Sequence, residues 1–103
     1  MNDWAEWTAS QPYTLGVEEE MMVLDPLDWS LAQRGDHVLA RLSPALTSHA
    51  TAETHEAALE LATAPHETVA GAAGEVAALR SALAADLAAN GLSAASAGTH
   101  PFA

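Results

Sequence analysis

The chain has 103 residues and a formal charge of −11, because 14 acidic residues stand against three arginines and no lysine. This balance argues against nucleic acid and against an anionic membrane as partners, since both require basic patches. The absence of cysteine excludes disulfides and thiolate metal sites. The sequence shows no signal peptide and no apolar run of bilayer length, so we expect a cytoplasmic protein that forms one small domain or part of a larger one.

The first predicted element is a strand from Thr14 to Leu24, after a leader over residues 1–12 that we expect to be irregular. Alternation places Glu18 and Glu20 on one face of this strand and Glu19 on the other. Two carboxylates about 7 Å apart on one face repel each other unless a cation lies between them. Hard oxygen ligands suit Mg²⁺ or Mn²⁺. The alternative interpretation is an edge strand with a hydrated acidic face.

The middle of the chain gives weaker signals. A helix is predicted over residues 31–42, although Gly35 weakens its start. Residues 51–63 are ambiguous, because alanine and glutamate favour a helix whereas the alternation of polar and apolar residues favours a strand. As a strand, this segment would carry Glu56 and Glu60 on one face and Leu59 and Leu61 on the other.

The second half predicts a long helix followed by a short strand. Pro65 can open the helix, and apolar residues recur at helical spacing from Val69 to Leu87. Asn90-Gly91 is a typical helix stop. Residues 92–97 then form a strand of small residues. The expected element order is therefore β-α-β-α-β in a mixed α and β fold. Because nothing covers the last strand and the chain stops on a proline-aromatic motif, we expect it to be the N-terminal piece of a longer protein.

Three segments of the chain together resemble the glutamate–cysteine ligase type 2 family of carboxylate–amine ligases. They are Gly16-Val-Glu-Glu-Glu20, then Glu56-Ala-Ala-Leu-Glu-Leu-Ala-Thr63 with Pro65 after it, and Gly98-Thr-His-Pro-Phe102. Their order and spacing match the family, and the resemblance extends from Tyr13 to the end of the chain. It implies that residues 13–103 are the incomplete N-terminal part of a glutamine-synthetase-like catalytic domain with a mainly antiparallel sheet.

The resemblance also implies a chemistry and a set of site residues. Such ligases use ATP to phosphorylate a substrate carboxylate, and an amine then attacks the acyl phosphate. Glu18 and Glu20 match the first acidic strand of the family, and Glu60 with Glu56 matches the second. These four carboxylates are the implied ligands of Mg²⁺ or Mn²⁺, whereas alternation leaves Glu19 as a structural or solvated acid. His100 is the implied contact to substrate or nucleotide, although a histidine before proline often serves only the backbone of a turn.

The resemblance implies glutamate and cysteine, or a similar amine, as substrates besides ATP, but nothing in the sequence identifies the pair. With three arginines and no lysine, the 103-residue chain is expected to be inactive alone. Two alternatives stay open. The chain could belong to a ligase of the same fold with other substrates. It could also be a small acidic interaction module without catalytic activity, which forms a homodimer through its uncovered sheet edge.

Overall fold

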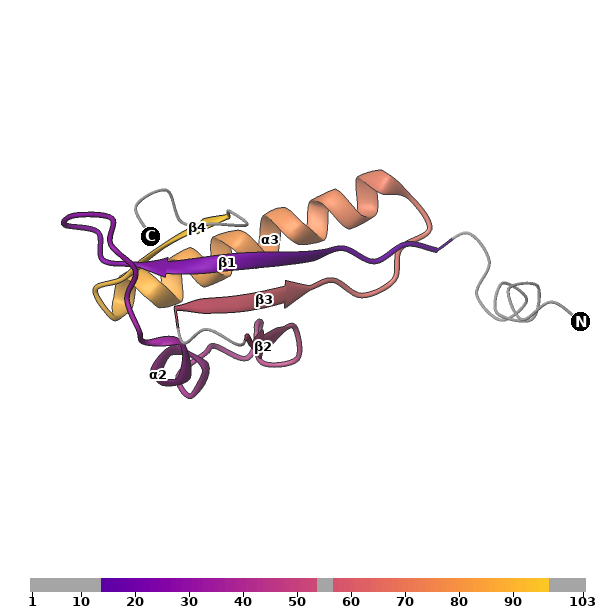
Figure 1. Ribbon diagram of the computed structural model, residues 1–103. Coiled ribbons are helices and arrows are strands. Elements are labelled where there is room, and N and C mark those ends of the chain that lie inside the picture. The colour runs from indigo at the N-terminus through magenta and orange to yellow at the C-terminus, as the bar shows by residue number, and fades with distance from the viewer. Residues whose placement is uncertain (1–13, 54–56, 97–103) are drawn as a thin grey trace, which may run out of the picture.

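The structure, a computed structural model, describes residues 14–53 and 57–96. In this part of the chain the elements follow the order β1 (Glu18–Leu24), α2 (Gly35–Leu39), β2 (Ala50–Ala52), β3 (Ala58–Ala62), α3 (Val69–Ala89) and β4 (Ser93–Ser96). The strands form one sheet in the order β2-β3-β1-β4, and every neighbouring pair is antiparallel. The helix α3 runs along β1 on one side of the sheet (Figure 1). The expected mixed fold with a mainly antiparallel sheet is confirmed.

The hydrophobic core lies between the sheet and α3. Alternate residues of β1 and β3 face the helix, and α3 contributes one leucine per turn. The core consists of Met21, Val23, Leu59, Leu61, Leu79, Leu83 and Leu87 together with Val38, Leu46, Ala50 and Leu92. The predicted assignment of Leu59 and Leu61 to the inner face of their strand is confirmed. Burial of these side chains is the main term that holds α3 on the sheet.

Caps at both ends fix the position of α3. The hydroxyl of Thr68 accepts a hydrogen bond from the Gly71 amide at 3.0 Å, so the helix begins at Val69 rather than at Pro65 as the sequence suggested. The predicted stop is confirmed. Asn90 is the C-cap, and Gly91 takes a left-handed conformation with φ of 71°, which glycine adopts at little steric cost.

Several predicted elements are shorter than the sequence suggested, and the first strand, expected over Thr14–Leu24, covers Glu18–Leu24. The helix expected over residues 31–42 covers only Gly35–Leu39, because Leu31 forms a bridge with Leu24 and the amide of Ala32 donates to the Val23 carbonyl. The segment 51–63 is not one strand. It is divided into β2 and β3, which pair with each other in antiparallel fashion, so the strand prediction holds for Thr51 and Ala52 and for Ala58–Ala62.

None of the helices within the described ranges is long and apolar enough to cross a membrane.

Candidate functional site

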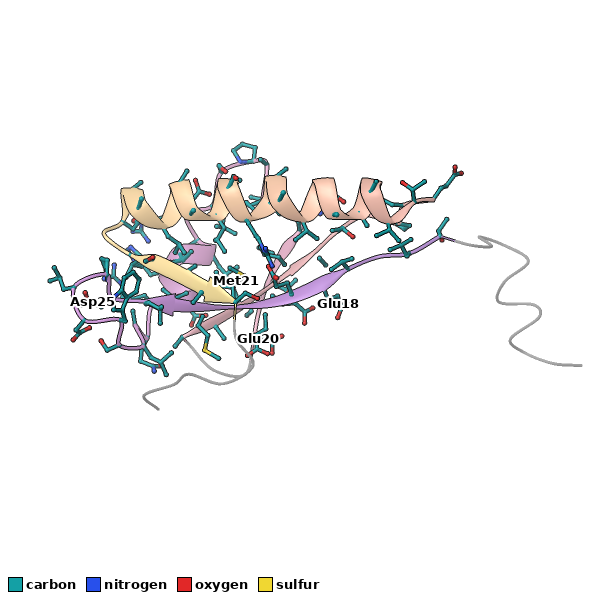
Figure 2. The ribbon with its side chains drawn as sticks, turned by 90° about the horizontal axis from the view of Figure 1, so that it is seen from above. Glu18, Glu20, Met21 and Asp25 are labelled. Atoms are coloured by element: carbon teal, nitrogen blue, oxygen red, sulfur yellow. The ribbon has the colours of Figure 1, made fainter. Side chains whose placement is uncertain are left out.

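The sheet face that points away from α3 carries a group of carboxylates. In the pairing of β1 with β3, Glu20 lies directly opposite Glu60, and Glu18 lies two residues along the same face of β1. Residues directly opposite each other have Cβ atoms about 4.5–5.5 Å apart. Glu18 and Glu20 are exposed and Glu60 is partly buried, and Figure 2 shows both β1 side chains on the side of the strand away from α3. The structure thus brings together three of the four predicted metal ligands.

A further carboxylate, Glu53, joins this group from the end of β2. Thr51 lies opposite Glu60 in the β2–β3 pairing, and Glu53 follows two residues later. The largest cause that raises the pKa of Glu60 is the hydrogen bond that its protonated carboxyl group donates to the Glu53 carboxylate, followed by the negative charge of Glu18, desolvation, and the charges of Glu53 and Glu20. We refer to Glu18, Glu20, Glu53 and Glu60 as the acidic face. Within this face the other carboxylates disfavour the charged form of Glu60.

The acidic face lacks a counter-charge in the described part of the chain. The ion pairs found there join Arg80 to Glu19 and the histidines His49 and His66 to Glu75, and none includes a member of the acidic face. Like charges directly opposite each other on a sheet are destabilising. Repulsion between these carboxylates therefore lowers the stability of the folded state.

Glu19 lies on the opposite face of β1, as alternation predicted. The Arg80 guanidinium on α3 binds its carboxylate through two nitrogens, with Nε 2.6 Å from Oε1. The hydroxyl of Ser96 on β4 donates to the same carboxylate at 3.0 Å. The Arg80 hydrogen bond is the main cause that lowers the pKa of Glu19 below its usual range. The prediction of a structural role for Glu19 is confirmed, since it links β1, β4 and α3.

The carboxylates of the acidic face do not converge into a closed metal cage. Among residues 14–53 and 57–96, no group of three or more His, Asp or Glu side chains is arranged so that it could hold a metal ion. This arrangement is compatible with Mg²⁺ only in its usual mode, in which one or two carboxylates bind the ion and waters fill the other positions. Glu20 and Glu60 supply such a pair.

Two predicted site residues lie outside the described ranges. Glu56, the fourth predicted metal ligand, and His100, the predicted contact to substrate or nucleotide, both stay predictions. Glu53, in contrast, is a member of the acidic face that the sequence reasoning missed. Its place on the acidic face depends on the pairing of β2 with β3, which no local feature of the sequence marks.

A second polar cluster lies on the α3 side of the sheet and has a structural role. Glu75 Oε1 accepts hydrogen bonds from the Ala64 amide at 2.7 Å and from the His66 ring, whose Nε2 lies 2.9 Å away. His49 Nδ1 lies 2.8 Å from the Ala62 carbonyl, and its Nε2 is 3.9 Å from Glu75 Oε2. This cluster attaches the first half of α3 to the segments around β3.

Comparisons with known proteins agree with the resemblance seen in the sequence. Residues 14–103 match the family model described as Glutamate-cysteine ligase family 2 (GCS2). The "Putative glutamate--cysteine ligase 2" of Roseiflexus sp. (strain RS-1) is 38% identical over 91 residues, which are 88% of this chain and 24% of that protein. The protein of the same name from Bordetella avium is 35% identical over 97 residues, 93% of this chain and 24% of that protein. The chain thus spans about a quarter of the length of these relatives.

Proposed function

The chain belongs to glutamate–cysteine ligase family 2, and from this membership we propose that it is part of an ATP-dependent carboxylate–amine ligase. In the proposed reaction a substrate carboxylate oxygen attacks the γ-phosphorus of ATP, which gives an acyl phosphate and ADP. The amine then attacks the acyl carbon, and inorganic phosphate leaves as the amide bond forms. Glutamate and cysteine, or a similar amine, are the substrates that the family name suggests.

The role we propose for this segment is to supply carboxylates to the metal ions of that reaction. The observation that carries the proposal is the direct opposition of Glu20 and Glu60, with Glu18 beside them on the same face. The raised pKa of Glu60 supports it, because crowded carboxylates resist ionisation and a divalent ion bound among them would stabilise their charged forms. Bound there, Mg²⁺ or Mn²⁺ would neutralise charge that develops on the transferred phosphoryl group.

The residues of the acidic face then have distinct tasks. Glu20 and Glu60 would bind the ion directly because they oppose each other across β1 and β3. Glu18 and Glu53 flank them and would accept hydrogen bonds from the waters that Mg²⁺ retains. Glu56 as a further ligand and His100 as a contact to nucleotide or substrate belong to the proposal through the family resemblance.

A metal titration tests the proposal in the 103-residue chain. Mn²⁺ binding, followed by electron paramagnetic resonance of the free ion, is expected to weaken by about tenfold in Glu20→Gln and in Glu60→Gln, since each loses one of two direct carboxylate ligands. The matched control is Glu67→Gln, which removes one charge from an exposed position before α3. If the control weakens Mn²⁺ binding as much as the other two variants, the binding reflects net charge alone and the proposed ligands are wrong.

We further propose that the 103-residue chain has no ligase activity alone. Its only permanently charged cations are Arg34, Arg41 and Arg80. Arg80 is paired with Glu19, and the Nη1 atom of Arg41 lies 2.9 Å from Nδ1 of His37. A triphosphate needs more cationic contacts than this segment offers. With ATP, Mg²⁺, glutamate and cysteine we expect no ADP formation above the protein-free rate, and measurable ATP-dependent ligation would contradict this expectation.

A further inference from the structure

Glu19 is the β1 carboxylate that is bonded on the α3 side of the sheet, and it lies between the two β1 members of the acidic face. Its side chain is 15% exposed, whereas Glu18 and Glu20 are exposed. Arg80 binds both of its oxygens, and the Ser96 hydroxyl donates to Oε2. Three elements, β1, β4 and α3, thus meet at one carboxylate directly behind the acidic face.

A carboxylate that is so largely removed from water requires these donors. A partly buried charge without a partner favours any local rearrangement that returns it to water. In a strand such a rearrangement is a rotation or a bulge of the backbone, and the neighbouring side chains move with it because successive residues point to opposite faces. Exposure of Glu19 to water would therefore turn Glu18 and Glu20 away from their present orientation on the acidic face.

Repulsion within the acidic face acts on the same part of β1. Glu20 lies directly opposite Glu60, and like charges in that position repel each other. The repulsion acts between β1 and β3, and the bonds of Glu19 to Arg80 and Ser96 hold β1 from the α3 side. A charge-assisted bond through two nitrogens is strong and has a defined geometry, so it is suited to fix the backbone at this point.

We propose that Glu19, Arg80 and Ser96 act together as positioning residues, which hold the β1 carboxylates of the acidic face in the orientation that binds a divalent cation. The three residues act through the β1 backbone and do not touch the ion, because Glu19 and its partners lie on the α3 side of the sheet. Residues that support metal ligands in this way commonly change metal affinity by about 10–100-fold when they are replaced. The inference rests on the proposed metal site, since it assigns a task to the residues behind it.

The direction of the change in Mn²⁺ affinity separates positioning from the effect of charge alone. Arg80→Gln removes a positive charge, which by itself would make Mn²⁺ binding tighter, by no more than about twofold at physiological salt. Loss of positioning makes the binding weaker, and we expect a weakening of about tenfold. The matched control is Arg34→Gln, which removes the same charge from an exposed side chain at the start of α2. This control is expected to bind Mn²⁺ at least as tightly as the parent.

Two milder variants keep the test valid if Arg80→Gln does not fold. Arg80→Lys retains the charge but not the bond through two nitrogens, so we expect an affinity between those of the parent and Arg80→Gln. Ser96→Ala removes one donor to Glu19 without a change of charge and is expected to weaken Mn²⁺ binding by about threefold. Its control, Ser93→Ala in the same strand, should have no effect. Far-UV circular dichroism identifies the variants that are folded, and a folded Arg80→Gln chain that binds Mn²⁺ as tightly as Arg34→Gln overturns the proposal.

A measurement on the metal-free chain separates this inference from the proposed metal site. Cross-strand nuclear Overhauser effects between Glu20 and Glu60 report that the two residues lie opposite each other. We expect these effects to weaken in Arg80→Gln and to persist in Arg34→Gln. If the parent binds no Mn²⁺ at the acidic face, the proposed function fails, and weakened effects in Arg80→Gln still support the positioning role. Unchanged effects in a folded Arg80→Gln chain overturn the positioning role, whatever the metal titration gives.

Discussion

The two glycines in the first half of α3 give a sharp test of how this helix is held on the sheet. An added Cβ at Gly74 meets no atom within 4 Å, whereas one at Gly71 would lie 3.0 Å from His66 Nδ1 and 3.2 Å from Thr68 Oγ1. Gly74→Ala is therefore expected to stabilise the fold by about 1 kcal/mol, because alanine in a helix interior restricts the unfolded chain and introduces no clash here. For a domain of this size the gain corresponds to a rise in Tm of about 4–8 °C.

Gly71→Ala brings the same gain in helix propensity, but the added Cβ would lie close to neighbouring side chains. The Thr68 hydroxyl caps the helix, and the His66 ring is bonded to Glu75, so neither neighbour can move without weakening a bond that positions α3. Loss of an N-cap costs about 1 kcal/mol, which offsets the gain from alanine. We expect Gly71→Ala to be neutral or destabilising by up to about 1 kcal/mol, so the two variants differ by about 1–2 kcal/mol.

The assay is urea unfolding followed by far-UV circular dichroism. Unchanged m-values would show that the variants alter stability rather than the denatured state. Equal stabilisation by Gly71→Ala and Gly74→Ala would refute the reasoning, because it would mean that Thr68 and His66 do not crowd Gly71. Destabilisation by Gly74→Ala would contradict the open space described at that position.

Two further predictions concern the same fold. The hydrogen bonds of Glu75 with the His66 ring and the Ala64 amide lower its pKa below the usual 4.5, so its stabilising effect is present above that value and disappears as the pH falls through the lower folded-state pKa. Urea midpoints of the parent and of Glu75→Gln should therefore converge as the pH falls from about 5 to about 3, and a constant gap would contradict this role. Leu83→Ala, which empties a fully buried core position, is expected to cost about 2–5 kcal/mol, whereas Leu27→Ala at a side chain that is 92% exposed should change stability by no more than about 0.5 kcal/mol, as thermal unfolding can measure.

The periodicity of the sequence predicted the structure correctly where the pattern was strong and uninterrupted. The alternation in β1 predicted that Glu19 would face away from Glu18 and Glu20, and the regular pairing of Glu18 to Met22 with β3 shows why the prediction held: no bulge interrupts the alternation there. The helical repeat from Val69 to Leu87 and the Asn90-Gly91 stop likewise predicted α3 and its end.

Prediction from the sequence was wrong where pairing with distant strands overrode the local preference for a helix or a single strand. Residues 31 and 32 have helical propensity, yet backbone bonds to the end of β1 hold them extended. The division of residues 50–62 into two strands depends on the pairing of β2 with β3, and no local signal marked it. The same division places Glu53 on the acidic face. Its role was missed because cross-strand neighbours depend on register, which a single segment does not reveal.

The distribution of carboxylates across the sheet gives the strongest physical argument for an external cation. On the α3 side of the sheet Glu19 binds Arg80 and Glu75 binds His66. One residue away along β1, the acidic face has only carboxylates as charged neighbours among the described residues, and the hydrogen bond with Glu53, followed by the charge of Glu18, raises the pKa of Glu60. Arg80 and His66 thus help to attach α3, and no cationic side chain of the described residues pairs with the acidic face. A cation that neutralises this face must come from outside the described residues, and a divalent ion bound between Glu20 and Glu60 would neutralise both charges of this opposed pair.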